Sequence, residues 1–107
     1  MMGTCYATPV QIIAKRTLRV FWENHPQART PLQSWFATVS KSAWNSPADV
    51  KTEFGATVDF VADNRVVFDI SGNKYRLVVR VAYSHKRVLI KFVGTHADYD
   101  KINARTV

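Results

Sequence analysis

The fold is decided by residues 74–101, KYRLVVRVAYSHKRVLIKFVGTHADYDK. This stretch predicts two β-strands with cations among their apolar residues, followed by a polar cluster that contains a histidine and a tyrosine. Because side chains alternate between the two faces of a strand, Lys74, Arg76 and Arg80 are expected on one face. Apolar and aromatic side chains occupy the other. The pattern therefore predicts a sheet with one apolar side and one cationic side.

The preceding and following residues extend this pattern to an antiparallel meander. Residues 65–70 alternate between apolar and polar, and a Ser-Gly-Asn turn joins them to the strand that begins at Tyr75. A second turn leads to a third strand, residues 87–93. The apolar face of this third strand is expected to hold Val88, Ile90 and Phe92. Residues 10–14 are a further short strand candidate.

Helices are predicted in the first half of the chain. Apolar residues at i, i+3 and i+4 within residues 15–24 indicate one helix, which the following His-Pro pair ends because a residue before proline avoids the helical region. Thr30 and Ser46 each precede a proline and so mark two further helix starts. The predicted class is α+β, with N-terminal helices packed on a small twisted antiparallel β-sheet.

Composition narrows the class of protein. A chain of 107 residues predicts a single domain, and we expect residues 10–107 to form it, with residues 1–9 as a flexible leader. Cys5 alone cannot form an internal disulfide. There is no secretory signal and no apolar run long enough for a membrane span, so the cytosol is the expected compartment. The net charge of +7 favours a polyanionic partner, with nucleic acid ahead of an anionic membrane surface.

The candidate chemistry lies in and just after the last two strands. The guanidinium of Arg76 is suited to binding phosphate through two parallel hydrogen bonds. A histidine changes charge near neutral pH, so His96 can act as a general acid or base. Tyr99 can stack on a base or donate through its hydroxyl. Since RNA carries its own nucleophile in the 2′-hydroxyl, a metal-free ribonuclease needs only a base, an acid and guanidinium groups.

Each of these residues also has a more ordinary interpretation. An arginine on an outer strand face is commonly a solvated cation, a single loop histidine is commonly structural, and a tyrosine there can be an aromatic at the edge of the core. Asp98 and Asp100 are a weak signal for a metal, because two carboxylates in a short helix do not make a ligand set. We expect them to serve local structure instead.

Several motifs in one order resemble the HigB toxin family, which belongs to the wider RelE-like group. They are residues 63–68 (DNRVVF), 72–80 (GNKYRLVVR) and 92–102 (FVGTHADYDKI), supported in the helical half by residues 21–26 (FWENHP) and 46–51 (SPADVK). The resemblance spans residues 10–107. It implies a RelE-like fold and the toxin of a type II toxin–antitoxin system: an endoribonuclease, or mRNA interferase, that cuts messages during translation on the ribosome without metal or cofactor.

The resemblance also implies partners and site residues. The partner is a HigA-like antitoxin with a helix-turn-helix domain, and operator DNA is contacted only through that antitoxin. Arg76, His96 and Tyr99 match the residues expected at the catalytic centre. The cations expected to bind RNA are Lys74, Arg80, Lys91 and Lys101.

Two alternatives remain from the sequence. A non-catalytic RNA-binding module would use the same cationic face, and its affinity would fall with salt without any cleaved product. An inactive homologue would bind its antitoxin without arresting growth. The enzyme is favoured because a binding module has no need of His96 and Tyr99 beside Arg76.

Overall fold

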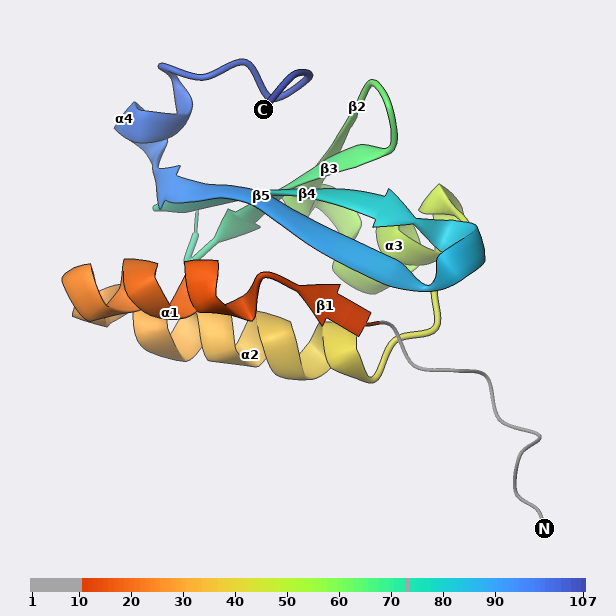
Figure 1. Cartoon of the computed structure of the whole chain (residues 1–107), viewed down its shortest axis with the longest axis horizontal. Helices are drawn as coiled ribbons and strands as arrows, with labels where there is room; N and C mark the ends of the chain where they lie inside the picture. The colour runs from red at the N-terminus through yellow and green to blue at the C-terminus, as the bar shows by residue number, and fades with distance from the viewer. Residues whose placement is uncertain (1–10, 73) are drawn as a thin grey trace, which may run out of the picture.

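The computed structural model describes residues 11–72 and 74–107, which form a five-stranded mixed sheet with α1 and α2 against one face (Figure 1). The elements are β1 (Gln11–Ile13), α1 (Lys15–Asn24), η2 (Pro26–Ala28), α2 (Arg29–Ser40), α3 (Pro47–Phe54), η3 (Gly55–Thr57), β2 (Val58–Val61), β3 (Arg65–Ile70), β4 (Tyr75–Ala82), η4 (Tyr83–His85), β5 (Arg87–Thr95) and α4 (His96–Tyr99). The predicted leader, residues 1–9, lies outside the described residues. None of the helices in the described ranges combines the length and the apolar character that a membrane crossing requires.

The α+β class is confirmed, but the sheet is not wholly antiparallel. Strands β3 to β5 form the predicted antiparallel meander. Strand β2, which was not predicted, extends the meander by pairing with β3. Strand β1 pairs with β5 in parallel, with Ile12 opposite Val88. The periodicity of a strand gives its faces but not the direction of its neighbour, so a three-residue strand from the start of the chain could not be oriented in advance.

The main core lies between the sheet and the helices. Leu18 of α1 and Leu32 of α2 are fully buried against the helix-facing residues of β3 and β4. Trp35 contacts the Phe68 ring edge-on, with the ring centroids 5.4 Å apart. Helix α2 begins at Arg29, directly after η2, so Thr30 lies inside the first turn and is not its cap as predicted.

A β-bulge at Lys91 reverses the faces of the second half of β5. Val78 pairs with Phe92 while Val79 pairs with Ile90, which leaves Lys91 as an extra residue on β5. Ile90 therefore faces the helices, whereas Phe92 packs on the opposite side of the sheet. The expectation that Phe92 would share a face with Val88 and Ile90 was wrong for this reason.

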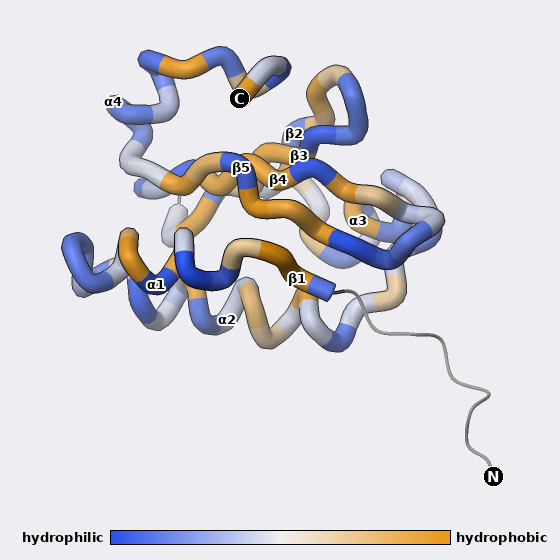
Figure 2. Tube along the Cα trace, viewed as in Figure 1, coloured by the Kyte–Doolittle hydropathy of each residue, from blue (hydrophilic) through white to orange (hydrophobic). Residues whose placement is uncertain are grey.

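The C-terminal segment covers much of the sheet face that points away from α1 and α2. It crosses over that face after α4, and apolar residues lie along it and along the strands beneath (Figures 1 and 2). Val67 and Val78 are buried there with Ala104, and Phe92 and Ile102 pack around them. The predicted cationic face is thus divided by a small second core, which separates Arg76 from the cations farther along the sheet.

Candidate functional site

Arg76 lies at the centre of three strands, near the start of β4. Its cross-strand neighbours are Asp69 on β3 and Gly94 on β5. The guanidinium forms an ion pair with the Asp69 carboxylate, and only 14% of the Arg76 side chain is exposed. Its Cζ atom lies 5.5 Å from the centre of the Tyr99 ring. Fixed on one side by a carboxylate and flanked by an aromatic ring, this guanidinium has a defined orientation, as phosphate recognition requires.

Gly94 permits the close packing of α4 on the end of β5. A Cβ atom at this position would lie 2.6 Å from Cζ of Phe92 and 3.0 Å from Cβ of Asp98. Both distances are too short for carbon atoms, and one of the two neighbours belongs to α4. Gly94 also stands opposite Arg76 on the neighbouring strand, so α4 packs beside the strand position that carries the guanidinium.

The four residues of α4 are held by a capping box. The Thr95 hydroxyl accepts a hydrogen bond from the backbone N–H of Asp98 at 3.2 Å, and the Asp98 carboxylate accepts one from the Thr95 N–H at 3.3 Å. Asp98 therefore has the local structural role predicted for it. His96 and Tyr99 are three residues apart in this helix and so lie on neighbouring positions of one side.

His96 is oriented by a carboxylate. Its Nδ1 atom lies 3.3 Å from Oδ2 of Asp100, and about half of the imidazole is exposed. If Nδ1 carries the proton donated to Asp100, Nε2 remains for a substrate. An acid–base group held by a second residue at its other nitrogen is a recurrent arrangement in enzyme sites. The structure therefore places Arg76, Tyr99 and His96 together at one end of β4 and β5.

The remaining predicted cations are not all brought to this place. Arg80 does share a sheet face with Arg76, but it lies four residues farther along β4, roughly 13 Å away at the usual rise of a strand. There its guanidinium is 3.2 Å from Asp63, which also binds Arg65 at 3.0 Å. Two nitrogens of Arg65 in turn donate to the Val107 carbonyl. Arg80 belongs to this second cluster, and not to the site around Arg76.

Three lysines have different surroundings. Lys74 lies in the turn before β4, and its Nζ donates to Oε1 of Gln27 at 3.0 Å, on the helix side of the sheet. The prediction that it shares the face of Arg76 was wrong, because the alternation of a strand does not extend into a turn. Lys91 is the exposed bulge residue of β5, and Lys101 is exposed just after α4.

The tyrosine with a shifted pKa lies away from Arg76. Burial raises the pKa of the Tyr83 hydroxyl, but Tyr83 is in η4 at the far end of β4. Within residues 11–72 and 74–107, no three side chains of His, Cys, Asp or Glu come close enough together to hold a metal ion. The ionisable groups gathered around Arg76 and α4 are the guanidinium with the Asp69 carboxylate, the His96 imidazole with the Asp100 carboxylate, and the Tyr99 phenol.

Two contributors to the site were missed in the sequence. Asp69 could have been found, because the predicted hairpin with its turn at residues 71–73 places it opposite Arg76. The importance of Gly94 could not have been found, because it depends on the ring of Phe92. The bulge turns that ring to the sheet face that points away from α1 and α2.

Gly94→Ala is expected to destabilise the fold by about 1–3 kcal/mol, the usual cost of overpacking, and to lower any activity that depends on α4. The added methyl must displace either the Phe92 ring or Asp98. Chemical denaturation measures the first effect and an activity assay the second. Gly72→Ala is a suitable contrast, because a Cβ there meets no atom within 4 Å and its cost comes only from a positive φ of 61°. Unchanged stability in Gly94→Ala would contradict the packing argument.

The α+β fold, with an arginine on the middle strand and a His–Tyr pair after the last strand, is consistent with the RelE-like class of toxins. The chain belongs to the HigB toxin family: the family model, described as the RelE-like toxic component of a toxin–antitoxin system, matches residues 28–102. The chain is 29% identical over 96 residues to "mRNA interferase toxin HigB" of Escherichia coli (strain K12) and to "mRNA interferase HigB" of Shigella flexneri. Each alignment covers 89% of this chain and 92% of the relative.

Proposed function

We propose that this toxin is an endoribonuclease that cleaves messenger RNA, and that Arg76, His96 and Tyr99 form its catalytic centre. The observation that carries the proposal is the guanidinium of Arg76, which is held by Asp69 and flanked by Tyr99 with His96 in the same short helix. The relatives whose names describe mRNA interferases support it, because the alignments extend over nearly the whole of both chains.

The proposed reaction is an internal transesterification that needs no metal. A base takes the proton of the 2′-hydroxyl, O2′ forms a bond to phosphorus, and the bond from phosphorus to O5′ breaks. An acid then protonates the departing O5′. The products are a 2′,3′-cyclic phosphate on the upstream fragment and a 5′-hydroxyl on the downstream fragment. Arg76 stabilises the charge that develops on the phosphate oxygens.

The side chains are assigned as follows. His96 transfers one of the two protons, because its second nitrogen is directed by Asp100. Tyr99 stacks on or positions a nucleotide next to Arg76. Lys91 and Lys101 are exposed, and with the net charge of +7 they favour the approach of an RNA chain.

Membership of the family supports a proposal for the biological setting. We propose that cleavage occurs in the cytoplasm on messages bound to the ribosome, and that the partner is a HigA-like antitoxin with a helix-turn-helix domain. Operator DNA would then be bound only through that antitoxin. A cell that produces a growth-arresting toxin needs an antitoxin that neutralises it.

Controlled expression followed by mapping of RNA ends tests the function. We expect growth arrest, and new RNA 5′ ends that carry a hydroxyl and lie within translated regions. Purified toxin should cleave ribosome-bound message that carries a 2′-hydroxyl at the cut site, and should not cleave the same message with a 2′-deoxynucleotide at that position. Binding of RNA without cleavage would favour the RNA-binding module, and normal growth with antitoxin binding would favour an inactive homologue. Products with 5′-phosphate ends, or cleavage of the 2′-deoxy message, would contradict the proposed transesterification.

A further inference from the structure

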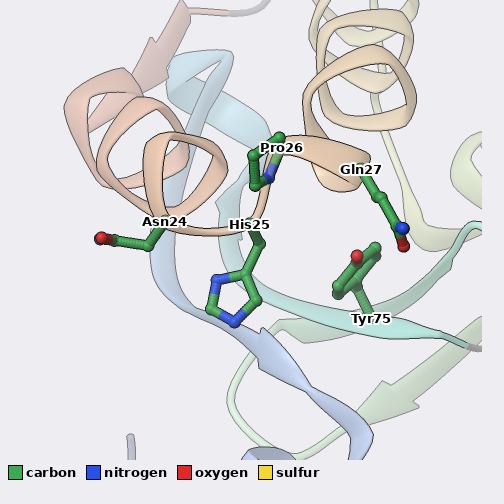
Figure 3. A pocket seen from close by; sticks show the side chains of 5 residues that line it. All are labelled: Asn24, His25, Pro26, Gln27 and Tyr75. Atoms are coloured by element: carbon green, nitrogen blue, oxygen red, sulfur yellow. The ribbon is translucent and has the colours of Figure 1, made fainter.

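A cavity of about 370 Å³ lies on the helix side of the same end of the sheet, between the end of α1 and the start of β4. It is lined by Asn24, His25, Pro26, Gln27 and Tyr75, and is called the α1–β4 pocket below (Figure 3). Its volume is within the usual range for small-ligand sites, roughly 300–1,000 Å³. None of its lining residues belongs to the proposed catalytic centre.

Aromatic rings form one wall of the α1–β4 pocket. The His25 imidazole stacks on the Phe21 ring, with centroids 4.3 Å apart and an interplanar angle of 13°. Both rings meet Tyr75 edge-on, at 5.6 Å from Phe21 and 6.4 Å from His25. Tyr75 is itself only 5% exposed, so this wall is supported by the core. Flat, supported rings of this kind are what an unpaired nucleobase stacks upon.

The rim of the pocket offers hydrogen-bonding groups on fixed side chains. His25 Nδ1 lies 3.3 Å from the Phe21 carbonyl, which leaves Nε2 for a ligand when Nδ1 donates. Oε1 of Gln27 accepts from Lys74, which orients the amide and leaves its two N–H groups as donors. The Asn24 amide donates to the Val20 carbonyl, so its oxygen remains as an acceptor. Donors and acceptors side by side are what the edge of a base requires, and Lys74 adds a positive charge for the backbone.

The pocket is continuous in sequence and register with the proposed catalytic centre. Tyr75 and Arg76 are consecutive on β4, so one faces the pocket and the other the centre. Tyr75 pairs with Thr95, the residue before His96. A strand of RNA that passes over this end of the sheet can therefore place one phosphate at Arg76 and an adjacent base in the pocket.

We infer that the α1–β4 pocket is a subsite for one unpaired nucleobase of the message, next to the bond that is cut. Stacking on His25 would give affinity, and the amide of Gln27 would give preference among bases. This inference rests on the proposed endoribonuclease activity. It adds to that activity the residues that would select which base lies next to the cut. Lys74 then contributes to RNA binding from the helix side, and not from the face of Arg76.

The test compares His25→Ala and Gln27→Ala with wild type on a set of ribosome-bound messages that vary one position at a time around the cut. His85→Ala is the matched control, since His85 is an exposed histidine in η4 at the other end of β4. For His25→Ala we expect kcat/KM to fall about 5- to 150-fold, which is the usual loss when one base no longer stacks on a ring. Most of this loss should come from a higher KM. Gln27→Ala should broaden the preference at a single position and leave the others unchanged. The His85→Ala control should have the kcat/KM and the base preference of wild type.

A substrate with an abasic nucleotide at that position completes the test. Wild type should lose the same factor on this substrate as His25→Ala loses on the intact one, and combining the two changes should cost no more than either alone. Gln27 is exposed, so its variant retains the fold even if His25→Ala melts at a lower temperature. If wild type cleaves and both variants keep its preference and KM, the subsite is refuted while the activity stands. A fall in kcat alone would also refute it. If wild type does not cleave RNA at all, the proposed function itself fails.

Discussion

Arg76→Ala is expected to lower kcat/KM for RNA cleavage by about 10²- to 10³-fold, the usual effect of removing one donor to transition-state charge. The reason is geometric. The guanidinium is largely enclosed, paired with Asp69 and flanked by the Tyr99 ring, so it cannot be replaced by a neighbouring cation. Arg76→Lys should recover only part of the loss, because an ammonium cannot form two parallel hydrogen bonds to a phosphate. Single-turnover cleavage of a labelled message measures the effect.

Stability must be separated from chemistry in this variant. Removing Arg76 leaves the Asp69 carboxylate, about a quarter exposed, without its partner. Asp69→Ala combined with Arg76→Ala removes that unpaired charge, and thermal unfolding shows whether the fold is retained. We expect the double variant to be at least as stable as Arg76→Ala and equally inactive. Wild-type cleavage by a folded double variant would refute the role of Arg76.

Arg80→Ala provides the internal comparison. Arg80 lies on the same strand and the same face as Arg76, but about half of its side chain is exposed and it is paired with Asp63. We expect a small loss of kcat/KM that comes only from a higher KM, because an exposed cation contributes only a screened attraction to RNA. The difference between this variant and wild type should become smaller as the salt concentration rises. Equal losses from Arg76→Ala and Arg80→Ala would show that the cationic surface acts as a whole and would favour the binding module.

The fold was predicted where local pattern decides it. The alternation in residues 65–70 and 75–83, with a Gly-containing turn between them, was enough to predict β3, β4 and their antiparallel pairing. The bulge at Lys91 was not, because both residues after it are apolar and either can face the core. The parallel pairing of β1 depends on where α1 packs, which no local pattern contains.

The site was predicted from residue types and the family resemblance more than from geometry. Arg76, His96 and Tyr99 were singled out; the structure places the Tyr99 ring against Arg76 and His96 in the same short helix, and their catalytic roles stay predictions. Lys74 was assigned to the wrong face because the strand period was extended into a turn. The α1–β4 pocket was not foreseen, since it requires the end of α1 to meet the start of β4, and these segments are far apart in the chain.

His96→Ala is expected to lower kcat by about 10²- to 10⁴-fold, the range for loss of a general acid or base. The fold should remain, because the cap of α4 is made by Thr95 and Asp98 and does not involve the imidazole. About half of the His96 side chain is exposed, so no core contact is lost either. Cleavage rates measured across pH give the decisive reading: the limb that reports histidine ionisation should be present in wild type and absent in the variant.

Two further variants separate a chemical role for His96 from a structural one. Asp100→Asn removes the charge that orients Nδ1 but keeps the imidazole, so it should reduce kcat less than His96→Ala does. Added imidazole should restore part of the activity of His96→Ala, since the vacated space is open to solvent, and should not affect Arg76→Ala. A His96→Ala enzyme that keeps the wild-type pH profile would show that the proton is transferred by another group. Tyr99, whose ring lies against Arg76, would then be the first candidate, and Tyr99→Phe would remove its hydroxyl while keeping the stacking surface.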